Sequence, residues 1–325
     1  MLTYFYFDED IFEDEAFKGI PLAGSTLLDF WQEYGCLGIN NNKIEFLTKN
    51  LKDKLPPKVY KDWITIVPRL LKFDIELSKG NLSDYNDFDL VKGDCNQYNI
   101  STAITVTEYK DCYKKHLDDE FEIICPSTIT HSKFFSDSKN FSKKSIGSNE
   151  SLDYIWATRF DKLTKQVKVI TIIDRYLVKS IMHDIGTYDE NDKKNHTSLE
   201  EFLRRLSKNK TKHTVNIFSS INSSGEEINC SKLKIYINEN LLKKKFMNNS
   251  NIKVNITLCK NSYFSNTAHD RMIRFGDFHI AEIGNGLDIF RQNNIKNNSF
   301  TIKGIEQTEF KSIHSTLCNN FKWKL

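Results

Sequence analysis

The residues best suited to chemistry lie near the C-terminal end of the sequence. His269 and Arg271 open this segment, and a glycine-rich turn, Gly284-Asn285-Gly286, closes it. A histidine can act as a nucleophile or transfer a proton, and an arginine can grip a phosphate through two parallel hydrogen bonds. These residue types therefore suit acid–base or nucleophilic chemistry, or the binding of an anionic group. The candidate catalytic residues are His269, Arg271 and Asn285.

A second candidate position follows a predicted strand. Residues 167–173 form an almost unbroken β-branched run, typical of a strand buried on both faces, and Asp174 and Arg175 come directly after it. The carboxyl ends of parallel strands are where α/β proteins bind ligands. An alternative interpretation is that Asp174 only caps a helix or pairs with Arg175. The candidate ligand-binding residues are Asp174, Arg175, Asp277, Gly284 and Gly286.

These segments together resemble the phospholipase D-like domain at the C-terminus of MIT-domain proteins. In that family a His-Asp-Arg opening and a glycine-rich closing bracket a hairpin, and residues 170–176 are similar to its first core strand. The resemblance covers residues from about 152 to 325. Nothing in residues 1–150 resembles the helical MIT domain.

The wider phospholipase D superfamily has the signature His-x-Lys-x4-Asp-x6-Gly-Ser-x-Asn. His269 fits its histidine, and Gly284 fits its glycine. The sequence departs from the signature at Arg271, Asp277, Asn285 and Leu287. Because Asn285 and Leu287 replace a serine and an asparagine, hydrogen-bond donors for a phosphate oxygen are lost. The remaining residues favour phosphate binding over turnover.

The resemblance also implies a mechanism. In the superfamily a histidine attacks a phosphodiester phosphorus, and a second histidine protonates the leaving oxygen. Since this sequence has one evident copy of the motif, catalysis would need a second histidine, from a homodimer or from a residue such as His183 or His213. Such cleavage would be metal-independent, because the histidine forms the covalent bond.

We expect a protein that recognises the phosphate groups of polymers or headgroups. If the chain is bacterial, nucleic acid is the favoured partner. The resemblance, and no residue, also suggests a place in bacterial antiviral defence. One alternative is a metal-independent phosphodiesterase, a nuclease, that uses His269 in a dimer. Another is an adaptor without catalytic activity that binds a protein partner. Phosphoinositide binding is not favoured, since no basic, aromatic amphipathic helix is evident.

Composition excludes some classes of protein. The 325 residues are 39% hydrophobic and 12% aromatic, which suits packed cores, and the net charge of +3 argues against a protein coated in nucleic acid but not against a local basic site. Residues 7–15 are acidic, and residues 204–212 and 242–245 are basic. We interpret these runs as solvated faces, with a polyanion path along the first basic run as the alternative.

Seven scattered cysteines contain no Cys-x-x-Cys pair, so neither a zinc site nor a disulfide framework is predicted. The acidic residues Asp8, Glu9, Asp10, Asp74 and Glu76 could hold magnesium, but no motif accompanies them. We therefore expect no metal and no cofactor. Without a signal-peptide pattern or an apolar stretch of about 20 residues, we expect no transmembrane segment and a cytoplasmic location.

Patterning predicts an α/β chain with two domains. Residues 1–145 read as an α+β domain of unknown role, with strands at 2–7, 103–106 and 121–125, a helix capped by Ser25, helices at 50–55 and 57–71, and a polar connection at 127–148. Residues 146–325 read as the phospholipase D-like domain with a largely parallel mixed sheet. Its predicted elements are a helix at 154–163, strands at 167–173, 214–219 and 253–259, helices at 198–206 (capped by Ser198) and 241–247, and a hairpin at 269–283.

Overall fold

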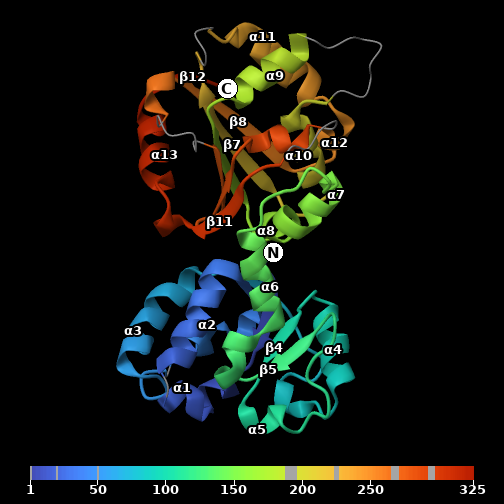
Figure 1. The fold of residues 1–325 in the computed structure, drawn as a ribbon, viewed down its shortest axis with the longest axis vertical. Coiled ribbons are helices and arrows are strands. Elements are labelled where there is room, and N and C mark those ends of the chain that lie inside the picture. The colour runs from blue at the N-terminus through green and yellow to red at the C-terminus, as the bar shows by residue number, and fades with distance from the viewer. Residues whose placement is uncertain are drawn as a thin grey trace. The chain divides into compact units, whose positions relative to one another are not determined.

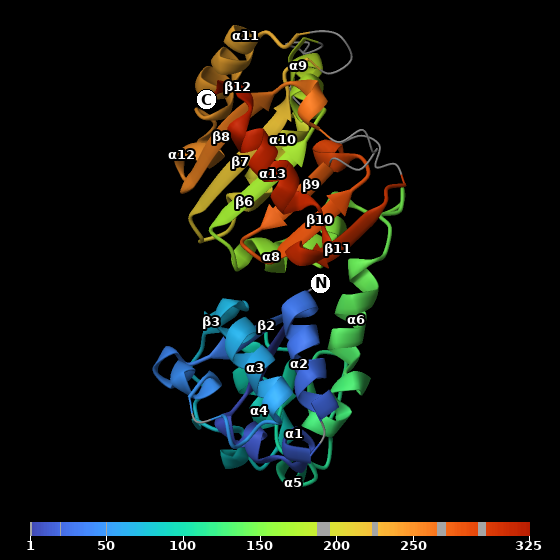
Figure 2. The ribbon, with the colours of Figure 1, turned by 90° about the vertical axis from the view of Figure 1, so that its left-hand side faces the viewer.

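The computed structural model describes residues 2–19, 21–49, 51–186, 196–222, 227–264, 271–291 and 297–325. The chain divides into two compact units, Met1–Asn140 and Phe141–Leu325 (Figures 1 and 2). The division expected from the sequence falls a few residues later, between 145 and 146. Each unit has its own sheet.

The N-terminal unit is built on a five-stranded sheet of order β3-β2-β1-β4-β5, in which every described pairing is parallel. The strands are β1 (Thr3–Phe7), β2 (Gly35–Ile39), β3 (Lys72–Asp74), β4 (Thr102–Ile104) and β5 (Glu122–Ile124). The helices are α1 (Glu15–Gly19), α2 (Pro21–Tyr34), α3 (Pro57–Ile66), α4 (Phe88–Asn96), α5 (Thr107–Lys110) and α6 (Lys133–Ser142).

Aromatic side chains form the centre of this unit's core, where α2 and α3 lie side by side (Figure 2). The rings of Phe5 and Trp31 meet edge to face at 5.5 Å, and those of Phe12 and Trp63 at 5.4 Å. Both indole N–H groups are satisfied, since Trp31 donates to the Leu71 carbonyl and Trp63 to the Leu47 carbonyl. The aromatic residues therefore bury their rings without leaving a polar group unpaired.

The α/β class is confirmed, but the N-terminal unit differs from the expected α+β arrangement. Its strands alternate with helices and run parallel, because each helical crossover returns the chain to the end of the sheet at which the previous strand began. Ser25 lies inside α2, which begins at Pro21, so its predicted capping role was wrong. The predicted helix at 50–55 is absent from the described residues 51–55, which form turns. The expected connection at 127–148 contains most of a 3-10 helix (Pro126–His131) and all of α6.

The C-terminal unit contains a seven-stranded mixed sheet, within the described residues, of order β11-β10-β9-β6-β7-β8-β12. The central strands β6 (Val169–Asp174), β7 (His213–Ser220) and β8 (Ile252–Cys259) are parallel. The antiparallel strands are β9 (Arg271–Phe275), β10 (His279–Ile283), β11 (Phe300–Gly304) and β12 (Phe321–Lys324). The parallel part is thus confined to three strands of a mixed sheet.

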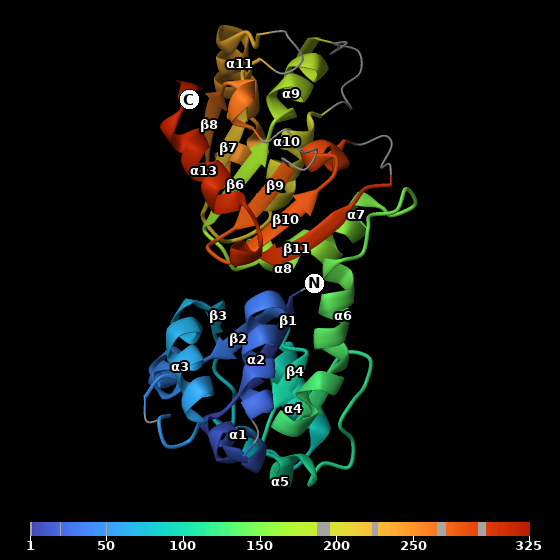
Figure 3. The same cartoon turned by 60° about the vertical axis from the view of Figure 1, so that its left-hand side comes forward.

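Helices flank both sides of this sheet. They are α7 (Leu152–Ile155), α8 (Asp161–Lys165), α9 (Leu177–Gly186), α10 (Ser198–Leu206), α11 (Cys230–Ile235), α12 (Lys245–Asn248) and α13 (Phe310–Asn319). Figures 1 and 3 show α13 across one face, where Phe310 and Leu317 join a core cluster with Ile173 and Met272. In Figure 1 α10 lies on the other side, where the Phe202 and Phe290 rings meet at 5.4 Å.

The predicted strands at 167–173, 214–219 and 253–259 are confirmed as β6, β7 and β8, and the described part of the predicted hairpin is β9 and β10. The helix Ser198–Leu206 is also confirmed, but its cap was misplaced by one residue. Thr197, not Ser198, accepts the N–H of Glu200 through its hydroxyl at 3.2 Å. No helix in the described ranges is both long enough and apolar enough to cross a membrane.

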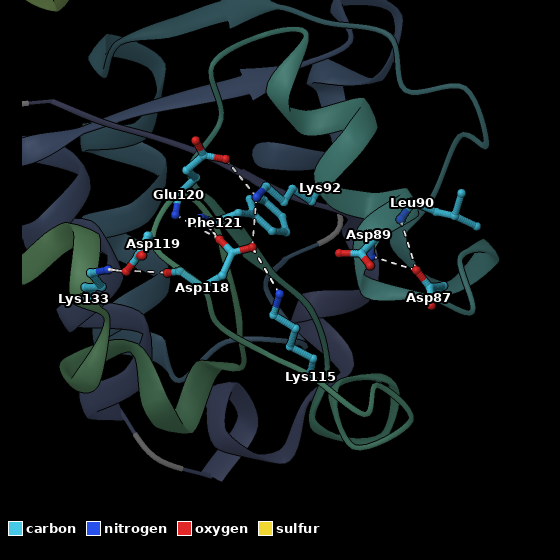
Figure 4. Close-up of polar contacts among 10 residues, drawn as sticks. All are labelled: Asp87, Asp89, Leu90, Lys92, Lys115, Asp118, Asp119, Glu120, Phe121 and Lys133. Carbon is cyan, nitrogen blue, oxygen red and sulfur yellow. Dashed lines mark hydrogen bonds and ion pairs between the residues drawn. The ribbon is translucent and has the colours of Figure 1, made fainter.

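Asp118 fastens the loop before β5 to α4 (Figure 4). Its Oδ2 lies 2.9 Å from Lys92 Nζ and 3.3 Å from Lys115 Nζ, and its Oδ1 accepts the backbone N–H groups of Glu120 and Phe121 at 2.9 Å each. Lys92 first, and then these N–H groups and Lys115, hold the pKa of Asp118 well below its usual range. A lowered carboxyl pKa stabilises the fold above about pH 4, and this contribution is lost as the pH falls further.

We predict that Asp118→Asn lowers the midpoint of thermal unfolding at pH 7 by roughly 2–4 °C, because the charge that pairs with two lysines is removed. The difference from the unaltered protein should shrink as the pH falls below 4. Calorimetry between pH 7 and pH 3 measures both effects. The matched control is Asp119→Asn, since Asp119 is fully exposed and lies 3.5 Å from Lys133. Equal midpoints for the two variants at pH 7 would contradict the assignment.

Candidate functional site

A buried carboxylate, that of Asp174, ends β6 and connects three segments. Asp174 is 4% exposed. Its Oδ1 accepts the N–H of Tyr176 at 3.0 Å and lies 3.9 Å from Nε of Arg271, while its Oδ2 accepts the N–H of Leu287 at 3.3 Å. The end of β6, the start of β9 and the turn after β10 therefore meet at one carboxyl group.

Burial raises the pKa of Asp174 to about 6, since a carboxylate in this position has lost its hydration. The Arg271 guanidinium and the N–H groups of Tyr176 and Leu287 oppose this shift, and Asp288 adds to it. The pKa of Asp174 is thus raised in spite of its partners. Desolvation outweighs the nearby positive charge.

Arg271 holds the same junction together from β9. Its Nη1 donates to the carbonyl oxygen of Gly284, and its guanidinium carbon lies 5.0 Å from the centre of the Tyr176 ring. The side chain is 23% exposed. Arg271 therefore has a structural role in the turn after β10, and only a minor part of it faces solvent.

The two glycines of the Gly284-Asn285-Gly286 turn are required by close packing. A Cβ on Gly286 would lie 1.9 Å from Asp174 Oδ2, and its φ of +55° is one that other residues rarely adopt. A Cβ on Gly284 would lie 2.6 Å from Ser299 Oγ and 2.7 Å from Asn298 Oδ1. The Asn285 side chain is exposed, while its N–H donates to Asn298 Oδ1 at 3.0 Å.

Arg175 differs from Arg271 in its partners. Its Nε donates to Asn261 Oδ1 at 2.6 Å, and its guanidinium lies 5.3 Å from the Tyr176 ring centre. Among the described residues no carboxylate lies within ion-pair distance of it. Its carbonyl accepts the N–H of Ser220 at 3.2 Å, so the backbone here also ties β6 to the end of β7. Arg175 is a half-buried cation at the carboxyl ends of the parallel strands.

Polar contacts hold the 3-10 helix Gly286–Phe290 against α9. The residues that make them were not among the predicted site residues. Ser180 Oγ donates to Asp288 Oδ2 at 3.2 Å. Arg291 Nη2 donates to Asp184 Oδ1 at 2.7 Å and to the Ser180 carbonyl at 3.3 Å. These partners are more than 100 residues apart and belong to no motif, so spacing in the sequence carries no signal for them.

The structure brings together six of the predicted site residues at one end of the sheet: Asp174, Arg175, Arg271, Gly284, Asn285 and Gly286. It does not bring Asp277 to them. Asp277 lies in the turn after β9, and because Asp174 faces Arg271 while Ile170 faces Phe275, this turn is at the opposite end of β6. His269 lies outside the described residues.

The two other histidines considered as catalytic partners lie in different environments. His213 begins β7, at the end of the sheet opposite Asp174, and is 2% exposed. His183 is an exposed residue of α9. Over the described ranges, no group of three or more His, Cys, Asp or Glu side chains is arranged to hold a metal ion.

We predict that Gly286→Ala destabilises the C-terminal unit by more than about 3 kcal/mol, because the added carbon overlaps the Asp174 carboxylate at a positive φ. Gly304→Ala is the control, since a Cβ there meets nothing within 4 Å. Urea unfolding of both variants measures the effect. Similar free energies of unfolding for the two variants would refute the packing argument.

We also predict that Asp174→Asn changes how stability depends on pH. Between about pH 4 and pH 6 the native protein binds more protons at Asp174 than the unfolded chain, so its free energy of unfolding falls as the pH rises. Asp174→Asn removes this ionisable group, so the decrease in the free energy of unfolding over this pH range should be smaller by about 3 kcal/mol. Urea unfolding from pH 4 to 7.5 tests it, with Asp277→Asn as the exposed control. Parallel pH profiles for Asp174→Asn and the unaltered protein would sink the prediction.

Comparison with known proteins supports the resemblance inferred from the motif. Residues 232–322 match the family model of the phospholipase D-like domain at the C-terminus of MIT. The match includes Arg271 and the Gly284-Asn285-Gly286 turn but not Asp174. No curated protein matches the sequence. Residues 232–322 of this chain are therefore similar to the phospholipase D-like domain found at the C-terminus of MIT proteins.

Proposed function

We propose that the C-terminal unit recognises the phosphate groups of nucleic acid at the carboxyl ends of β6, β7 and β8. The proposal depends on one observation: the half-buried guanidinium of Arg175 has no carboxylate partner among the described residues. Asn261 uses one of its five N–H donors, and the others suit the oxygens of a phosphate.

The surroundings of Arg175 support the same ligand. The guanidinium carbon of Arg271 lies 5.0 Å from the centre of the Tyr176 ring, and that of Arg175 lies 5.3 Å from it, so one aromatic ring is in contact with two cations. The carboxylate of Asp174, the residue before Arg175, accepts backbone N–H groups, and burial raises its pKa to about 6. A ligand at this edge would therefore meet more positive than negative charge. This edge therefore suits an anionic ligand, and a phosphodiester backbone carries one negative charge at every nucleotide.

Catalysis would require His269, which precedes Arg271 by two positions in the sequence signature and would have to act with a second histidine. The phosphodiesterase and adaptor alternatives make different predictions from the binding proposal. A phosphodiesterase cleaves its substrate in EDTA, an adaptor binds no nucleic acid, and a binding protein retains the intact polymer.

We predict that Arg175→Ala weakens binding of a fluorescent single- or double-stranded oligonucleotide by about tenfold, and lowers the slope of log K against log salt by about 1. Fluorescence anisotropy at several salt concentrations, in EDTA, measures both. The matched control is Lys168→Ala, which removes the same charge beside the opposite end of β6. Thermal unfolding checks that both variants are folded.

Three other outcomes are informative. Equal loss of affinity in Arg175→Ala and Lys168→Ala would overturn the site assignment. Cleavage in EDTA that disappears in His269→Ala would replace the proposal with a phosphodiesterase. An unaltered protein that binds neither DNA nor RNA would rule out nucleic-acid recognition and direct the search towards a protein partner.

A further inference from the structure

A concave region lies in the C-terminal unit, where α10 and α12 are in contact. Two adjoining cavities of about 530 and 480 Å³ share His196, Glu200 and Lys244 in their walls. None of their lining residues belongs to the junction of Asp174, Arg271 and Gly286. We call the smaller cavity, lined by His196, Glu200, Arg204, Lys244, Lys245, Phe246 and Asn249, the α10–α12 groove.

The charges of the α10–α12 groove are arranged around one buried carboxylate. Glu200 is 3% exposed, and its Oε1 lies 2.6 Å from His196 Nδ1 and 2.9 Å from Lys244 Nζ. Arg204 is paired with Glu201, its Nε donating to Oε2 at 2.9 Å. Lys245 is exposed, and no carboxylate in the described ranges pairs with it. The cations therefore outnumber the carboxylates, and the excess charge is on the solvent side.

An aromatic ring and an amide stand beside these cations. Phe246 of α12 is half-buried, and its ring has no aromatic partner among the described residues. Asn249, which follows α12, is exposed. A flat apolar face can stack on a nucleobase, an amide can hydrogen-bond a base edge, and lysines can hold a phosphate.

We propose that the α10–α12 groove binds one nucleotide, with the base stacked on Phe246 and its edge near Asn249. Lys245 and Lys244 hold the phosphate. The nucleotide is part of single-stranded nucleic acid or a free mononucleotide, since both present the same base and phosphate. A duplex is not suited, because its base faces are already stacked. This site is separate from the one at Arg175.

The spacing of these residues along the chain does not link them to one site. Arg204 belongs to one basic run and Lys244 and Lys245 to another, and each run alone is typical of a solvated face. The fold places α10 against α12, so the two runs line one groove. The aromatic residue that distinguishes a nucleotide site from a charged surface follows Lys245 directly.

The test compares Phe246→Leu with Phe246→Trp. Leucine keeps an apolar side chain but removes the aromatic face, so it should weaken binding of a fluorescent oligo-dT or oligo-U by about tenfold, whereas tryptophan should retain or strengthen binding. Lys245→Ala should weaken binding at low salt more than Lys232→Ala, which removes an exposed charge from α11. Circular dichroism and thermal unfolding confirm that the variants are folded.

Calorimetry with adenosine and uridine mononucleotides and with inorganic tripolyphosphate identifies the source of the ligand. Mononucleotide binding that is lost in Phe246→Leu assigns a free nucleotide, while an effect restricted to the oligonucleotide assigns single-stranded nucleic acid. The proposal is wrong if tripolyphosphate binds as tightly as the mononucleotides and Phe246→Leu changes neither affinity. It is also wrong if no probe binds. If Arg175→Ala weakens oligonucleotide binding and Phe246→Leu does not, the proposed site at Arg175 is supported and the groove proposal fails. If Phe246→Leu weakens binding and Arg175→Ala does not, the groove proposal is supported and the site at Arg175 fails.

Discussion

The arrangement of the C-terminal site depends on the buried carboxylate of Asp174. A carboxylate that is removed from water must be compensated by hydrogen bonds and opposite charge, or it takes up a proton. The N–H groups of Tyr176 and Leu287 and the guanidinium of Arg271 provide this compensation only in part, since burial still raises the pKa of Asp174 to about 6. Because Arg271 and Leu287 lie about 100 residues after Asp174 in the sequence, satisfying one carboxylate sets the position of the end of β6 relative to the start of β9 and the turn after β10.

This constraint separates the roles of the two arginines. Arg271, the motif residue, donates to the Gly284 carbonyl and faces Asp174, so much of its bonding capacity serves the fold. Arg175, which lies outside the His-x-Lys signature, donates a hydrogen bond to an amide oxygen, lies against an aromatic ring and has no carboxylate partner among the described residues. The motif arginine therefore serves packing, and in our proposal ligand recognition depends on the neighbouring Arg175.

Acidic residues serve a similar structural purpose in the N-terminal unit. Asp8, at the end of β1, accepts the Tyr6 hydroxyl and the Leu82 N–H, and burial raises its pKa to about 6. Asp14 Oδ2 accepts both the N–H and the hydroxyl of Thr107, at 2.8 and 2.9 Å. These carboxylates fasten loops at the carboxyl edge of the sheet, which explains why the acidic run seen in the sequence is not gathered into a magnesium site within the described residues.

The sequence by itself determined the α/β class, the three central strands of the C-terminal sheet and the segments that contain Asp174, Arg271 and the glycine turn. Those features are local, since β-branched runs, helix periodicity and glycine at tight turns leave a signal within a few residues. Only the tertiary structure decided that the N-terminal strands are parallel, that Asp277 lies away from Arg271, and that Arg204 and Lys245 line one groove. The physical reason is that strand direction, burial and the pairing of charges depend on contacts between segments far apart in the chain, which spacing along the sequence does not encode.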